Sequence, residues 1–220
     1  MMAFPTSDMA GHARLHDRVM TALNRCLESQ DVDFKESAPW PDLRYRIAKT
    51  AMAMGNLRDG GIVVVGASER NAIWELTGIS EGHLATYQAD DVIEQVNAFA
   101  SPYLELDVVL VRDPSGKTFL AIEAHEFAET PIVCKKSHTA KDTGIVLEAG
   151  ALYIRPPGVA QTVKVGDARQ MHDLLELAAE KRARRMLEAA RRIGLVPGAG
   201  TTTPLEPRDR ELFDQELSGL

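Results

Sequence analysis

At residues 59–66 the chain reads Asp-Gly-Gly-Ile-Val-Val-Val-Gly. The four residues from Ile62 to Val65 are all β-branched, and an unbroken run of this kind is typical of a central strand that is covered on both faces. The preceding Asp-Gly-Gly supplies residues that favour a turn. The stretch therefore predicts a buried strand that starts after a tight turn and ends at Gly66.

A second strand is predicted at residues 31–36, which read Asp-Val-Asp-Phe-Lys-Glu. Because side chains alternate along a strand, Val32 and Phe34 should point to one face, and Asp31, Asp33 and Lys35 to the other. The segment should therefore present an apolar face to the core and a charged face to its surroundings.

Hydrophobic spacing and turn residues indicate the other elements. The pattern predicts helices over residues 13–27, 42–55, 90–99 and 167–193. It also predicts a hairpin of strands 106–111 and 118–122, short strands at 132–134 and 152–154, and a polar loop over 135–143. Helices and strands are interleaved, which indicates an α+β fold: a mixed β-sheet with packed helices and a long C-terminal helix. Along the chain we expect a flexible leader (1–10), a domain (11–165), the long helix (166–194) and an acidic, proline-containing tail (195–220).

Composition limits the possible classes of protein. The chain has 220 residues, 45% of them hydrophobic, and a formal net charge of −7. These values exclude a wholly disordered chain. The net negative charge argues against a protein that coats nucleic acid through charge attraction alone. There is no apolar run long enough for a membrane helix and no signal-peptide pattern. Cys26 and Cys134 lie far apart in the sequence. We therefore expect a cytoplasmic protein with no membrane partner.

Three charged side chains are candidates for chemistry. Asp33 and Lys35 share a strand face, where a carboxylate can hold a hard divalent cation and an ammonium group can steady a phosphate. Glu69 follows the buried strand, and strand ends are common ligand sites. The alternative is structural: Asp33 and Lys35 would belong to a solvated edge strand, and Glu69 would face water.

Several motifs together resemble the Schlafen AlbA-like domain. The first is Glu28-Ser29 followed by Asp33-Phe34-Lys35-Glu36, and the second is the Gly-Gly strand of residues 59–66. The later motifs are Thr130-Pro131-Ile132-Val133 and the segment from Leu152 through Arg155 to Thr162. The resemblance covers roughly residues 20–175.

This resemblance implies work on nucleic acid. Bacterial members are commonly described as DNA-binding, and some animal Schlafens are endoribonucleases that use three carboxylates. By motif position these carboxylates are Glu28, Asp33 and Glu69, which would hold Mg²⁺ or Mn²⁺ while Lys35 contacts the scissile phosphate. Two positions depart from the family pattern: Asp33 stands where glutamate is usual, and Ser68 where a second acid is usual. Since the animal proteins carry two tandem copies, one copy here implies either a homodimer or a different mode of action.

Basic residues form the second set of candidates. On the long C-terminal helix they are Lys181, Arg182, Arg184 and Arg185, which could straddle phosphates or pair with the acidic tail. Arg46, Lys49 and Arg155 could line a groove with Lys135 and Lys136. No Walker loop and no G-x-G-x-x-G motif is present, so no nucleotide cofactor is predicted.

The sequence therefore favours a nucleic-acid-binding domain, with RNA preferred to DNA. If its acidic site is catalytic, the resemblance implies metal-dependent endoribonuclease cleavage of structured RNA such as tRNA. Two alternatives stay open. One is a non-catalytic DNA-binding module in regulation or defence, and the other is a protein-interaction or dimerisation scaffold.

Overall fold

The protein is described by a computed structural model that covers residues 9–71, 73–140 and 144–195. The chain divides into two compact units, Met1–Ala178 and Ala179–Leu220. The first unit contains a four-stranded sheet in the order β1-β2-β7-β6, whose strands are Val32–Lys35, Gly61–Val65, Thr118–Ala124 and Leu106–Arg112. The β1–β2 pair is parallel and the other two pairs are antiparallel. The predicted mixed sheet and α+β class are confirmed.

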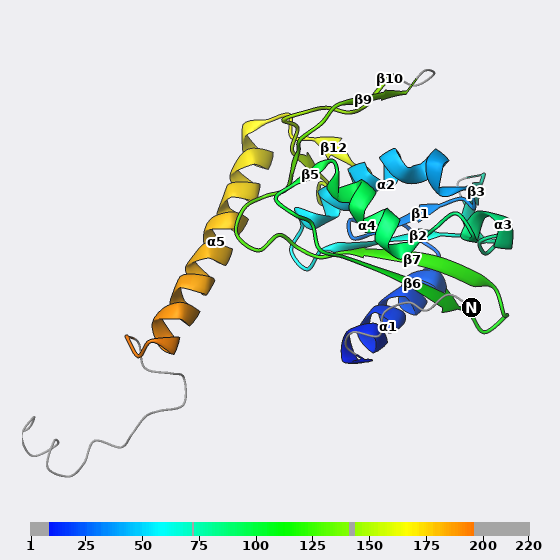
Figure 1. The fold of residues 1–220 in the computed structure, drawn as a ribbon, viewed down its shortest axis with the longest axis horizontal. Coiled ribbons are helices and arrows are strands. Elements are labelled where there is room, and N and C mark those ends of the chain that lie inside the picture. Colours follow the sequence, from blue (N-terminus) through cyan, green and yellow to red (C-terminus); the bar gives the residue numbers. More distant parts are fainter. Residues whose placement is uncertain (1–8, 72, 141–143, 196–220) are drawn as a thin grey trace, which may run out of the picture. The chain divides into compact units, whose positions relative to one another are not determined.

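Helices cover both faces of this sheet (Figure 1). The side chains of β2 alternate: Ile62 and Val64 pack with α1 (Met9–Arg25), whereas Val63 and Val65 pack with α2 (Trp40–Gly55) and α4 (Ala89–Asn97). All four are 0% exposed. The prediction of a central strand covered on both faces is therefore confirmed.

Strand β1 sets the direction of the charged side chains. Its register with β2 places Asp33 opposite Val63 and Lys35 opposite Val65. Val32 and Phe34 lie in the apolar cluster with α1, so the intervening Asp33 points to the other face of the sheet, where α2 lies. The predicted alternation is confirmed over Val32–Lys35, but Asp33 is buried, so the charged face is covered at this position.

Two hairpins lie where the sequence predicts none. The first follows β2 directly, and the second occupies much of the expected polar loop over residues 135–143. Neither shows the apolar alternation by which strands are recognised in a sequence: Ile73 and Ile145 are each 67% exposed. The two hairpins are β3–β4 (Ala67–Arg70, Ile73–Leu76) and β9–β10 (His138–Ala140, Gly144–Leu147).

The remaining elements are short, apart from the last helix. They are α3 (Glu81–Leu84), the pair β5–β8 (Ala100–Ser101, Val133–Cys134) and the pair β11–β12 (Tyr153–Ile154, Val163–Lys164). No helix in the described ranges is both long and apolar enough to span a membrane.

The expected long C-terminal helix is present as α5 (Ala168–Arg192). Leu174 is buried in the core of the first unit, but Leu175 is 53% exposed, although the spacing predicts that both are buried. The boundary between the two units falls within α5, after Ala178. The predicted leader and tail fall mainly on residues 1–8 and 196–220, which lie outside the described residues.

Candidate functional site

A buried ion pair lies where the sequence predicts a catalytic acid. Asp33 is 5% exposed, and its Oδ1 accepts a hydrogen bond of 2.9 Å from Nη1 of Arg155, whose side chain is fully buried. The other nitrogens of this guanidinium donate to backbone carbonyls. Nε donates to Gln30 O at 2.7 Å, and Nη2 donates to Ser29 O at 2.8 Å and to Val32 O at 3.1 Å. Arg155 thus ties the segment after β11 to the loop that precedes β1.

The prediction that Arg155 binds nucleic acid is therefore wrong. A buried charge is tolerated only when a counter-charge and hydrogen bonds replace its water. Here Asp33 and three carbonyl groups take up all three guanidinium nitrogens, and none of them reaches the surface. The role of Arg155 in this structure is to hold two segments together.

Lys35 and Glu28 complete the charged cluster around Asp33. Lys35 Nζ binds Oδ2 of Asp33, which agrees with the predicted shared strand face. Glu28 Oε1 accepts a hydrogen bond of 2.9 Å from the backbone N–H of Phe34. Burial raises the pKa of the Glu28 carboxyl and Asp33 adds to the rise, while the Phe34 N–H, Lys35 and Arg155 oppose it. Glu28, Asp33 and Lys35 are therefore electrostatically linked.

Glu69 does not join this cluster. The chain after β2 continues into the β3–β4 hairpin, where the exposed Glu69 is paired with Trp74. The hairpin is closed at its base because Gly66 O accepts hydrogen bonds from Thr77 N at 2.9 Å and Gly78 N at 2.7 Å. The predicted convergence of Glu28, Asp33 and Glu69 within metal-sharing distance is thus absent from the described structure. The sequence prediction treated residues 67–70 as a free strand end, whereas they form another strand.

The residues present do not fit the predicted Mg²⁺ or Mn²⁺ site. Both carboxylate oxygens of Asp33 already bind cationic side chains, which would repel a metal ion. In the described part of the chain, only Asp107, Glu123 and His125 bring three ligand atoms within 4.8 Å of one another. That trio also faces cations, since Arg18 Nη1 lies 3.0 Å from Glu123 Oε1 and Arg14 Nη2 lies 3.2 Å from it. The arginines there offset the repulsion of two acids on paired strands.

A cationic and aromatic stack lies on α2, at residues that the sequence analysis did not select. The ring of Tyr45 stacks on the ring of His138 from β9, with centroids 3.4 Å apart and planes inclined by 15°. The guanidinium of Arg44 lies over the Tyr45 ring, 4.5 Å from its centroid. Arg44 Nε is buried without a hydrogen-bond partner in the described structure. The triplet Arg44-Tyr45-Arg46 was a visible signal, because basic and aromatic residues alternate there.

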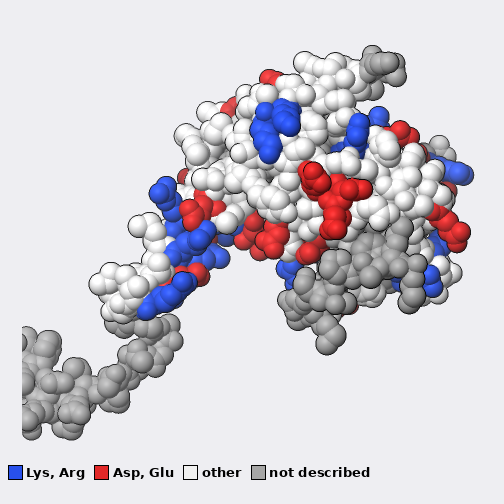
Figure 2. Space-filling view, in the orientation of Figure 1, with Lys and Arg blue, Asp and Glu red and all other residues white. Residues whose placement is uncertain are grey.

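The other predicted basic residues are dispersed. Arg46 is exposed on α2, whereas Lys49 lies over the ring of Tyr153 at 5.2 Å. In the second unit Arg182, Arg184 and Arg185 are exposed on α5 and Lys181 is half-buried, and Arg184 forms an ion pair of 3.1 Å with Glu180. Figure 2 shows separate groups of Lys and Arg on the visible face, with acidic side chains between them. The visible face of the first unit has no continuous basic band over the described residues, so an anion on this face would be bound locally.

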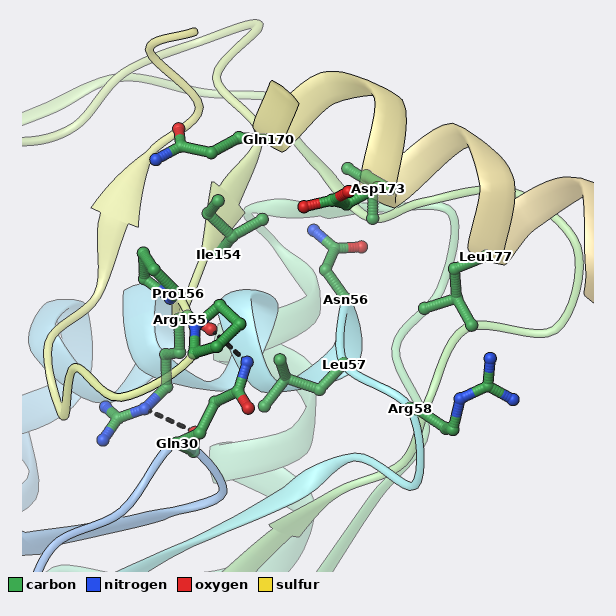
Figure 3. A pocket seen from close by; sticks show the side chains of 12 residues that line it. Gln30, Asn56, Leu57, Arg58, Ile154, Arg155, Pro156, Gln170, Asp173 and Leu177 are labelled. Atoms are coloured by element: carbon green, nitrogen blue, oxygen red, sulfur yellow. Dashed lines mark hydrogen bonds between the residues drawn. The ribbon is translucent and has the colours of Figure 1, made fainter. Parts of the chain in front are cut away.

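A cavity of about 250 Å³ adjoins the Arg155 segment (Figure 3). Its walls come from the loop before β1, the end of α2, the segment after β11 and the first turns of α5. Gln30 links the cavity to the buried ion pair, because its Nε2 donates to Arg155 O at 2.6 Å and its backbone O accepts from Arg155 Nε. The buried pair therefore fixes one wall of the cavity.

Together, the mixed sheet, the β1 segment with its acid and lysine, and the Gly-Gly strand define an α+β domain of one recognisable type. Residues 28–157 match the family described as Schlafen, AlbA_2. The match covers more than half of the chain, and the protein belongs to this family.

Solved structures show a more distant likeness. The DIP2311 protein from Corynebacterium diphtheriae is 19% identical with a TM-score of 0.47, over 70% of this chain and 27% of that one. The N-terminal domain of an ATP-dependent DNA helicase RecG-related protein from Nitrosomonas europaea is also 19% identical, with a TM-score of 0.40, over 70% of this chain and 95% of that domain. The chain thus spans about a quarter of the first protein and nearly all of the second domain. A comparison with curated proteins finds no match.

Proposed function

We propose that this Schlafen AlbA_2 domain binds single-stranded nucleic acid. The observation that carries the proposal is the stack of Arg44, Tyr45 and His138 on the surface between α2 and β9. His138 and Arg44 cover the two faces of the Tyr45 ring, so a base would stack on the outer side of His138, while Arg44 adds a cation for the phosphate backbone. A single strand is favoured over a duplex because only an unpaired strand offers its base faces for stacking.

Neighbouring side chains support the same surface. Arg46 lies next to the stack on α2 and is exposed. Lys135 and Lys136 are exposed just before β9, and Lys135 N donates at 2.7 Å to the backbone of Phe99, whose ring packs edge-on against Tyr45. These cations can neutralise phosphates locally although the whole chain is acidic. RNA is the preferred ligand, as the sequence analysis indicates, and DNA is the alternative.

Substitution of the stack tests the proposal. Tyr45→Ala removes the ring that holds His138 and Arg44 in place, so it should weaken binding of a labelled single-stranded 12-mer by about 5- to 150-fold, the loss of one stacked base at about 1–3 kcal/mol. Arg44→Ala should reduce the slope of log affinity against log salt by about 0.7, the value for one phosphate contact on a single strand. Fluorescence anisotropy across a salt series measures both effects, with RNA and DNA of one sequence in parallel.

Matched variants lie on other elements of the same unit. Tyr103→Ala removes another tyrosine that is 69% exposed, and Arg112→Ala removes an exposed arginine at the end of β6. Neither should change affinity or salt slope. Equal losses in Tyr45→Ala and Tyr103→Ala would assign the effect to general surface chemistry, and an absence of binding by every oligonucleotide would refute the proposal.

Cleavage of RNA is a second candidate function, and one observation favours it. Burial raises the pKa of Glu28, which lies beside Asp33 and Lys35, and a carboxyl tuned in this way is a candidate proton donor or acceptor. Incubation of the protein with tRNA tests it, with Mn²⁺ and with a chelator. Cleavage by the unaltered protein that Glu28→Gln abolishes would support the function, and intact tRNA under both conditions would exclude it for this substrate.

The homodimer also stays a prediction. The part of α5 in the second unit exposes four large apolar side chains, Met186, Leu187, Ile193 and Leu195, in its last turns and just beyond. Exposed apolar side chains of this kind favour association between two copies of the chain.

A further inference from the structure

The cavity beside Arg155 has the chemistry of a site for one flat ring. Its volume of about 250 Å³ lies just below the range typical of small-molecule pockets, so it has room for a single ring system but not for a polymer. The apolar part of its wall consists of Leu57, Ile154, Pro156, Pro157, Leu174 and Leu177. Apolar walls of this kind pack against the faces of a planar ring.

Only a few polar groups of the cavity are left for a ligand. The side chain of Asn56 is fully used, because Nδ2 donates to the backbone carbonyls of Ile132 and Tyr153 and Oδ1 accepts from Ile132 N. Gln30 Nε2 donates to the backbone O of Arg155, which leaves the Oε1 of Gln30 as an acceptor for a ligand. Gln170 Oε1 accepts from Gly166 N at 2.9 Å, which leaves its Nε2 as a donor.

Asp173 supplies a negative charge to the wall of the cavity. Its carboxylate has no hydrogen bond or ion pair with another described residue, and Figure 3 shows it directed toward the space between Ile154 and Asn56. A carboxylate has two acceptor oxygens, so its best partner carries two N–H donors side by side. The cavity therefore offers a paired acceptor from Asp173 and single amide groups from Gln30 and Gln170, whereas Arg58, which also lines it, already has a partner in the chain.

Guanine is the base whose hydrogen-bonding edge matches this set. Its N1–H and N2–H groups are adjacent donors, and its O6 and N7 are acceptors. Adenine and cytosine each offer one amino group beside ring acceptors, and uracil offers one N–H between two carbonyls, so none of them presents two adjacent donors. The carboxylate would accept from N1–H and N2–H, and the free Nε2 of Gln170 is a donor of the kind that O6 needs.

We propose that this cavity binds an unstacked guanine of a single-stranded nucleic acid, with Asp173 accepting hydrogen bonds from its N1–H and N2–H groups. The inference rests on the proposed function, and it names the base that the domain selects. Tyr45 lies in the second turn of α2 and the cavity lies at the end of that helix. At 1.5 Å of rise per residue the two are about 17 Å apart along the helix axis, a distance that a few nucleotides can span.

Free nucleotides and oligonucleotides test the two proposals separately. In titrations followed by calorimetry, GMP should bind the unaltered protein more tightly than AMP, CMP or UMP. Asp173→Asn should abolish that preference, a change of about 10- to 100-fold for one bidentate contact. Glu176→Gln is the matched control, because Glu176 is, like Asp173, an exposed acid on the same helix but does not line the cavity, and it should keep the preference for GMP.

Each outcome decides one proposal. If a 12-mer binds equally well with and without guanine, and GMP binds no better than AMP, the guanine site is refuted while the proposed function stands. If no oligonucleotide binds but GMP binds through Asp173, the proposed function fails and the cavity is a nucleotide site. Binding of arginine amide in place of GMP would assign the cavity to a peptide and overturn the inference. Thermal unfolding by circular dichroism should give Asp173→Asn the same midpoint as Glu176→Gln.

Discussion

Replacing Arg155 with Met should lower the free energy of unfolding by about 3–5 kcal/mol, the cost of removing one partner from a buried ion pair. The substitution leaves Asp33 buried with Lys35 as its remaining cation, and it removes the donors of the carbonyls of Ser29, Gln30 and Val32. For a chain of this length the thermal midpoint should fall by roughly 10 °C. Denaturant unfolding followed by circular dichroism measures the loss.

A second substitution tests whether the loss of stability comes from the unpaired charge of Asp33. Arg155→Met combined with Asp33→Leu removes both charges, so the double variant should be more stable than Arg155→Met alone. Lys35→Met is the matched control, because the Lys35 side chain is 21% exposed and its charge can be lost at lower cost. If Arg155→Met unfolds like the unaltered protein, the buried pair does not hold the two segments together.

Much of the fold could be predicted from the sequence because its core elements have strong apolar patterns. The run Ile62–Val65 and the alternation at Val32 and Phe34 reflect burial directly, and the structure places each of them as expected. The β9–β10 hairpin was missed for the opposite reason. Its Ile145 is largely exposed, so the segment carries no periodic signal that a sequence could show.

The site was harder to predict, since the fate of a charged residue depends on its partners. Asp33 and Lys35 were placed on one strand face correctly, but the sequence does not show that Arg155, more than a hundred residues away, would fill the space beside Asp33. The position of Glu69 depends on backbone hydrogen bonds to Gly66 that no side-chain pattern records. Tyr45 was not selected because an aromatic residue on a helix more often belongs to the core.

Replacing Gly60 with Ala should be among the most damaging single changes in the first unit, and it tests what the Gly-Gly motif does. Gly60 has φ of +63°, where a side chain is strained, and an added Cβ would lie 2.1 Å from the carbonyl oxygen of Ala124 at the end of β7. Since a backbone atom cannot yield as a flexible side chain can, we expect a loss of about 3 kcal/mol or more in the free energy of unfolding.

The glycine of the β6–β7 turn is the natural control for this change. Gly116 also has positive φ, +87°, but nothing lies within 4 Å of the position of its Cβ, so Gly116→Ala should cost only about 1–2 kcal/mol. Comparing the two in urea separates the cost of the backbone conformation from the cost of the clash. Equal losses would show that close packing against β7 is unimportant. A much larger loss for Gly60→Ala would mean that Gly60 packs a tight turn against β7. Neighbouring Gly61 is also close-packed, since its Cβ position lies 2.6 Å from Met54 Cγ and 2.9 Å from Asp31 O. Gly60 would then serve the packing of the turn against β7, and Gly61 the packing of α2 on β2.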